Sequence, residues 1–115
     1  MFFFVLYSEE APQFNAPLDD PIYMFNNTEM RIKCNPSGGP IPTRKWQKEA
    51  QDIDLTTVGG RYSMDKDGSL IIKNVVDTDA GKYTCIAENG IGSPVSSSGT
   101  AVILGLFNDF PLKWF

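Results

Sequence analysis

Histidine is absent from the 115-residue chain. This absence removes the side chain that most often serves as a general base or as a metal ligand. Two cysteines are present, too few for the four nitrogen or sulfur ligands of a structural zinc site. The serine run 96–98 has no histidine to activate it as a nucleophile. We therefore expect no enzyme activity, no metal site and no cofactor.

Clustered basic charge and long apolar runs are also lacking. The net charge is −4, from 14 acidic and 10 basic residues, and the longest basic run is Arg44-Lys45. Nucleic-acid binding usually needs a clustered basic surface, so nucleic acid is not an expected partner. No segment approaches the roughly 18 to 20 apolar residues that span a bilayer, so we expect no membrane insertion by this segment. The apolar start, residues 1–7, is followed by Glu9-Glu10 and makes a poor signal peptide.

Four acidic side chains raise the question of a calcium site. Asp52, Asp54, Asp65 and Asp67 lie within a short stretch of the chain. Calcium needs about six or more converging oxygen atoms, and these residues flank separate turns. We interpret them as ordinary turn aspartates.

Short segments with turns between them dominate the rest of the chain. Residues 30–34 and 82–88 alternate with period two, which is typical of half-buried antiparallel strands. Asp67-Gly68 and Asn89-Gly90 are hairpin signals, the first predicting a two-residue turn. The proline- and glycine-rich stretch 35–42 predicts a loop. Further strands are expected over residues 22–25, 43–48, 61–64, 70–72 and 95–104. Such a series of short strands predicts an all-β sandwich or barrel.

Cys34, Trp46 and Cys85 are the most informative residues. Each cysteine faces the same way as the apolar residues of an alternating strand, and Trp46 lies between them in the sequence. Two packed sheets lie about 10 Å apart, and a disulfide beside an indole ring can fill that space. The residues alone leave two alternatives open, a structural bridge or two free thiols in the core.

A second group of residues surrounds the second cysteine. Tyr83 precedes Cys85 by two positions, which is the place of a tyrosine corner, whose hydroxyl bonds to upstream backbone. Gly81 suits a tight bend ahead of it. Asp79 is placed to form a salt bridge with Arg61 across one end of the sandwich.

Together these motifs resemble the intermediate-set immunoglobulin domain, and most of all such domains in neural adhesion molecules of the contactin type. The resemblance implies a two-sheet antiparallel β-sandwich over residues 11–104. It also implies a Cys34–Cys85 disulfide and a core that includes Trp46, Leu70, Ile72 and Tyr83. Residues 1–10 and 105–115 are expected to be disordered extensions that add nothing to the fold. One departure is Arg44, where the family usually has an apolar residue.

The resemblance implies an interaction module at the cell surface or outside the cell. Its partners would be a protein, through homophilic or heterophilic adhesion, and neighbouring immunoglobulin-like domains of the same parent chain. The candidate surfaces are the loop 35–42, the edge 47–54 and the turn 89–92. The alternative is a spacer domain of an intracellular giant muscle protein, with reduced cysteines. Both cysteines are present beside the glycosylation sequon 26–28, with Asn26 as the acceptor, and this favours the extracellular alternative.

Overall fold

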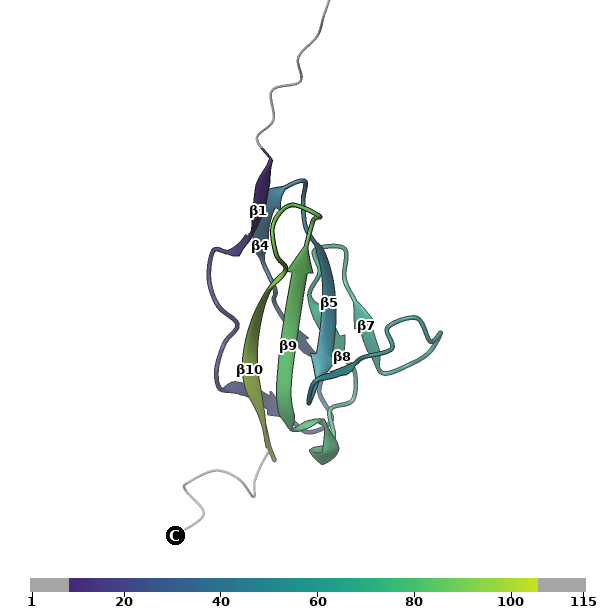
Figure 1. The fold of residues 1–115 in the computed structure, drawn as a ribbon. Helices are drawn as coiled ribbons and strands as arrows, with labels where there is room; N and C mark the ends of the chain where they lie inside the picture. Colours follow the sequence, from purple (N-terminus) through teal and green to yellow (C-terminus); the bar gives the residue numbers. More distant parts are fainter. Residues whose placement is uncertain (1–8, 106–115) are drawn as a thin grey trace, which may run out of the picture.

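The computed structural model describes residues 9–105, which form strands and one short 3₁₀ turn (Figure 1). Most of the two predicted extensions, residues 1–8 and 106–115, lies outside the described residues. The first strand begins at Glu10, one residue before the predicted start of the domain. The elements are β1 (Glu10–Phe14), β2 (Ile22–Phe25), β3 (Met30–Ile32), β4 (Pro36–Gly39), β5 (Thr43–Lys48), β6 (Gln51–Asp52), β7 (Tyr62–Met64), β8 (Leu70–Ile72), η1 (Asp77–Asp79), β9 (Gly81–Glu88) and β10 (Val95–Leu104).

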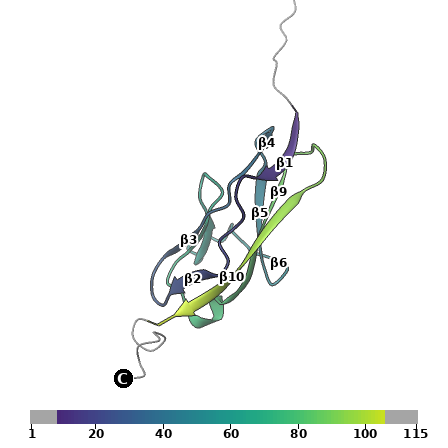
Figure 2. The ribbon, with the colours of Figure 1, turned by 90° about the vertical axis from the view of Figure 1, so that its left-hand side faces the viewer.

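Two sheets form the layers of a sandwich. One has five strands in the order β2-β10-β9-β5-β6, and the other has three in the order β3-β8-β7. All pairs within these sheets are antiparallel except β2 and β10, which run parallel. Figure 1 shows β9 in front of β8, and Figure 2, turned by 90°, shows β3 on the other side of the domain from β9. The expected all-β immunoglobulin-like sandwich is confirmed.

The core lies between the two sheets, because the strands alternate buried and exposed side chains. In β9 the inward side chains are Tyr83, Cys85 and Ala87, each fully buried. In β2 the alternation places Ile22 and Met24 inside. This period of two is what a pleated strand with one wet face requires. The buried cluster is completed by residues from both sheets and their connections, Leu18, Ile32, Cys34, Trp46, Leu70, Ile72, Val75 and Ala101.

The prediction of a loop over residues 35–42 is wrong in part, because Pro36–Gly39 forms strand β4. β4 pairs antiparallel with β1, and Phe14 lies opposite Pro36. Proline is tolerated here because it is the first residue of the strand. The pairing comes from a distant segment, and local composition carries no sign of it.

The turn between β7 and β8 also differs from its prediction. The hairpin is present, but its loop has five residues, and the Asp65 N–H donates to the Ser69 carbonyl at 2.9 Å. Gly68 alone in this loop has a positive φ, of 86°. The aliphatic part of the Arg44 side chain lies against Gly68, where a Cβ atom would collide with it. Arg44 does not delay β5, which begins at Thr43 as predicted, and one of its Nη atoms donates to the Pro42 carbonyl at 3.4 Å.

Candidate interaction surface

A disulfide joins the two sheets through Cys34, which follows β3, and Cys85 on β9. Both residues are buried, and Cys85 lies opposite Trp46 in the β5–β9 pairing. The Trp46 indole N–H donates to the Gly68 carbonyl at 2.9 Å, so its one polar group is satisfied inside the core. The disulfide and the indole ring therefore occupy the same interior, beside the predicted core residues Leu70 and Ile72.

The Tyr83 hydroxyl donates to the Asp79 backbone carbonyl at 2.7 Å. This bond ties the start of β9 to the η1 turn, which is the arrangement of a tyrosine corner. Burial, with the neighbouring Tyr62 hydroxyl, raises the pKa of Tyr83. The hydroxyl therefore stays protonated and keeps its role as donor.

We expect Tyr83→Phe to lower the free energy of unfolding by about 1 to 3 kcal/mol, because a buried carbonyl loses its donor. Chemical denaturation measures the effect as a lower midpoint at an unchanged slope. Tyr23→Phe is the matched control, since the Tyr23 side chain is exposed on the outer face of β2 and makes no hydrogen bond among the described residues. An equal midpoint for Tyr83→Phe and the parent chain would contradict the corner.

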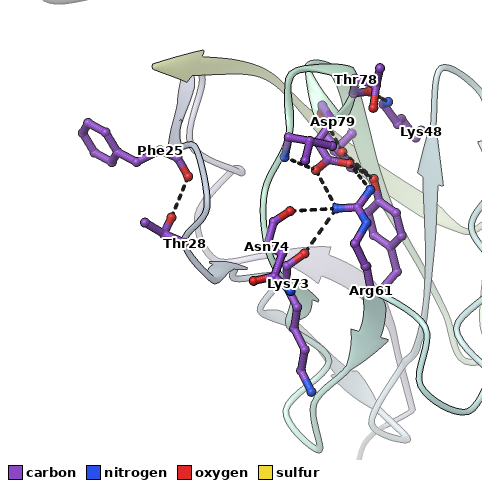
Figure 3. A network of polar contacts seen from close by, with 11 residues as sticks. Phe25, Thr28, Lys48, Arg61, Lys73, Asn74, Thr78 and Asp79 are labelled. Carbon is purple, nitrogen blue, oxygen red and sulfur yellow. Dashed lines mark hydrogen bonds and ion pairs between the residues drawn. The ribbon is translucent and has the colours of Figure 1, made fainter. Parts of the chain in front are cut away.

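Asp79 is the centre of a polar network at the end of the sandwich that carries η1 (Figure 3). Its carboxylate accepts two bonds from the Arg61 guanidinium, at 2.8 and 3.0 Å, one from the Val76 N–H at 2.8 Å, and one from the Tyr62 hydroxyl. Burial alone would raise the pKa of this carboxyl, but the bonds to Arg61, Tyr62 and Val76 outweigh burial and lower the pKa to about 2. The side chain is 1% exposed and is held as an anion. Tyr62 is not among the predicted site residues, because no spacing in the sequence distinguishes it from an ordinary strand residue.

Two of the three predicted surface segments, 35–42 and 89–92, meet at the end of the sandwich that carries Glu10, which we call the amino-terminal pole. Pro40 and Ile41 from one, with Asn89 and Gly90 from the other, border a shallow hollow of about 440 Å³. Ile41 is 79% exposed beside it. We call this region the Ile41 hollow; its remaining lining residues are Thr43 and Glu88.

Asn89 holds the Ile41 hollow in shape. Its side-chain amide donates to the Glu10 carbonyl at 2.7 Å and to the Pro40 carbonyl at 2.9 Å. Its side-chain oxygen accepts from the Ile91 N–H at 3.0 Å. One side chain thus connects β1, the β4–β5 connection and the β9–β10 turn. The sequence marks Asn89 only as a turn residue, because its partners are distant in the chain.

The third predicted segment, residues 47–54, is not part of this region. Thr43 pairs with Glu88 at one end of β5, and Lys48 pairs with Tyr83 at the other. The segment therefore lies toward the opposite pole. Its polar groups are engaged locally, with the Gln47 amide 2.9 Å and the Lys45 ammonium 3.1 Å from the carboxylate of Asp52.

The sequon lies in the turn after β2, at the carboxy-terminal pole. The Thr28 N–H donates to the Phe25 carbonyl at 3.3 Å, and its hydroxyl donates to the same carbonyl at 2.7 Å. The Asn26 N–H donates to the Leu104 carbonyl at 3.1 Å, next to the end of β10. Asn26 and the Ile41 hollow are thus at opposite poles.

The aspartates considered as calcium ligands have local roles. Asp54 accepts from the Thr56 N–H at 2.9 Å, and Asp67 accepts from the Ser69 N–H at 3.0 Å. Over residues 9–105 the structure contains no group of three or more cysteine, aspartate or glutamate side chains placed to hold a metal ion. The same residues contain no helix of the length and apolarity needed to cross a membrane.

A two-layer antiparallel sandwich with an inter-sheet disulfide, a core tryptophan and a tyrosine corner defines the immunoglobulin class of β-domain. The chain belongs to this family, since the family model described as "Immunoglobulin domain" matches residues 11–89.

The relatives of the chain include adhesion proteins and titin-like proteins. The chain is 35% identical over 95 residues to Contactin-4 of Rattus norvegicus, covering 82% of this chain and 9% of the relative. It is 33% identical over 98 residues to the Titin homolog of Caenorhabditis elegans, covering 83% of this chain and a share of the relative that rounds to 0%. Among solved structures, Sidekick-1 immunoglobulin domains 1–4 match with a TM-score of 0.73 at 29% identity, covering 84% of this chain and 25% of that one. The chain is therefore homologous to adhesion proteins and to titin-like proteins, and it spans less than a tenth of the curated relatives named here.

Proposed function

We propose that the chain is an extracellular protein-interaction module of a multidomain adhesion or receptor protein, and that a protein partner docks at the Ile41 hollow. The disulfide between Cys34 and Cys85 carries the proposal, because such a bridge forms and persists in oxidising compartments. The similarity to adhesion proteins supports the same compartment.

Rigid display is the mechanism that the surface favours. Asn89 holds three segments together around the hollow, and Ile41 lies between two prolines. An exposed apolar side chain on a backbone that is already fixed loses little conformational freedom on binding. The hollow then receives a side chain of the partner, while Ile41 packs against the partner's apolar surface.

A spacer role inside the cell is the second candidate, and the similarity to the Titin homolog supports it. In that role both sulfur atoms would remain reduced and would pack as small hydrophobic groups. The presence of both cysteines favours the extracellular module.

The docking surface is tested with a matched pair of substitutions. Ile41→Asp and Val58→Asp each place a carboxylate on an exposed apolar residue, and only Ile41 borders the hollow. Fluorescent tetramers of the secreted full chain are applied to intact cells and to beads coated with the same chain. We expect binding that falls more than about tenfold with Ile41→Asp, the effect of losing a central contact residue, and is retained by Val58→Asp.

Bead clustering identifies homophilic contact, and protease-sensitive binding to cells identifies a heterophilic partner. Binding that Ile41→Asp and Val58→Asp reduce equally would contradict the docking surface. A tetramer that binds neither beads nor cells would contradict the proposed function.

A further inference from the structure

Three exposed apolar side chains lie together at the carboxy-terminal pole. Tyr23 and Phe25 are on the outer face of β2, 57% and 36% exposed, and Val102 beside Tyr23 on β10 is 38% exposed. We call Tyr23, Phe25 and Val102 the β2–β10 strip. Exposed apolar groups that gather in this way usually have something to cover them.

The sequon turn begins where the strip ends. Phe25 is the last residue of β2, and Asn26 follows it directly. Asn27 has a positive φ of 63°, so the chain reverses here in a tight turn whose hydrogen bond runs from Thr28 back to Phe25. The Phe25 side chain points outward from this turn (Figure 3).

The Asn26 side-chain amide is available for modification. It makes no hydrogen bond to any residue that the structure describes. Neither of its polar side-chain atoms is both buried and without a hydrogen-bond partner, so the amide is open to solvent. The backbone of Asn26, by contrast, is fixed by the bond to Leu104. A group attached to this amide therefore starts from a fixed point in the chain, one residue after Phe25.

We propose that Asn26 carries an N-linked glycan whose first sugar packs on the Phe25 ring and covers the β2–β10 strip. The inference rests on the proposed extracellular function, since the modification occurs on the secretory pathway. A pyranose ring presents an apolar C–H face that suits an aromatic ring, and its rim of hydroxyls suits the polar groups around it.

The composition of the surrounding surface favours a glycan over a second copy of the chain. The outward residues of β10 that precede Val102, Thr100 and Ser98, are polar, whereas Leu104 after it is apolar, half-buried and opposite Phe25. Even with Leu104 the apolar surface here consists of four side chains, whereas a stable protein interface buries roughly 800 Å² on each partner. A glycan at this pole also leaves the Ile41 hollow free at the other.

The test uses the full chain, secreted behind a cleavable leader from mammalian cells grown with a mannosidase inhibitor, so that any glycan stays in the high-mannose form that endoglycosidase H cleaves. Mass spectrometry measures occupancy at Asn26, and endoglycosidase H then trims the glycan to one sugar. We expect occupancy in most molecules. We also expect the one-sugar protein to melt about 2 to 6 °C above the Asn26→Gln protein, the shift expected from one aromatic contact in a domain of this size.

Removing the Phe25 ring distinguishes a sugar that packs on the ring from a sugar that is only attached to Asn26. In Phe25→Ser the difference between the one-sugar protein and its Asn26→Gln counterpart should fall below about 1 °C, since the aromatic contact is gone. Tyr23→Ser should reduce the difference less, and Val58→Ser should retain it. An occupied Asn26 with no such difference in the parent chain would overturn the covering. So would a glycosylated chain that dimerises and is made monomeric by Phe25→Ser.

An Asn26 without a glycan on a secreted, disulfide-bonded chain would overturn this inference but would not contradict the proposed function. Free thiols on the secreted chain would contradict the proposed function instead, and the mass spectrum would still decide the state of Asn26.

Discussion

Replacing both cysteines, as Cys34→Ala with Cys85→Ala, should lower the free energy of unfolding by about 3 to 5 kcal/mol. The bridge closes a loop with a sequence separation of 51 residues, and it restricts the unfolded chain accordingly. The chain-entropy model attributes about 4 kcal/mol to a loop of that length. The loss is measured by urea denaturation monitored through tryptophan fluorescence, to which Trp46 beside the bridge contributes.

The reduced parent chain is the control for this experiment. Dithiothreitol opens the bridge but leaves both sulfur atoms in the core, so it separates the loss of the cross-link from the loss of side-chain volume. We expect the reduced chain to retain slightly more stability than the double variant. A midpoint that neither reduction nor substitution shifts would contradict a structural role for the bridge.

Asp79→Ala should lower the free energy of unfolding by about 2 to 3 kcal/mol, because the Tyr62 hydroxyl and the Val76 N–H lose their charged acceptor, while the partly exposed Arg61 keeps its bonds to the Lys73 and Asn74 carbonyls. The carboxylate is buried and makes four hydrogen bonds, so its loss costs more than that of a surface charge. Asp77→Ala is the matched control, because Asp77 belongs to the same η1 turn and is exposed. Equal denaturation midpoints for these two variants would contradict the role of the network.

The pH dependence of stability follows from the same carboxylate. The pKa of Asp79 falls from 3.8 in the unfolded chain to about 2 in the folded protein. A lowered folded-state pKa contributes stability above the unfolded value, and that contribution is lost as the pH falls from about 4 through 2. The loss is about 2 kcal/mol between pH 5 and the acid limit.

Asp79→Asn isolates this part of the pH profile. The pKa of Asp54 is also lowered to about 2, mainly by the Thr56 hydroxyl, but Asp54 is unchanged in the variant. The difference between the two profiles therefore reports Asp79 alone. Parallel profiles between pH 2 and 5 would contradict the assignment.

Strands could be predicted from the sequence where strand-forming residues run together and are bounded by turn residues. The bounds of β5 and β10 are those predicted, because a run of strand-forming residues ends at a turn signal in each. β4 was missed because Pro36–Gly39 has no such pattern and is a strand only through its pairing with β1. The length of the β7–β8 loop was missed for a related reason. Gly68 is required there by its own φ and by Arg44, a neighbour distant in the chain.

The surface was predictable in outline only. The segments 35–42 and 89–92 are both rich in turn residues, and the sequence indicated each as a candidate. Their meeting at one hollow depends on the register of β5 with β9, which brings Thr43 opposite Glu88. The role of Asn89 in holding the hollow could not be predicted either, because its amide donates to carbonyls far away in the chain. Side chains that connect distant backbone segments leave no periodic signal in a sequence.

Titration of free thiols in the full chain as secreted from mammalian cells, denatured without reduction, tests the central claim most directly. The claim is that this immunoglobulin domain works outside the cell with Cys34 joined to Cys85. We expect no reactive thiol before reduction and two per chain after it. Two reactive thiols per chain before reduction would contradict the claim and favour the intracellular spacer.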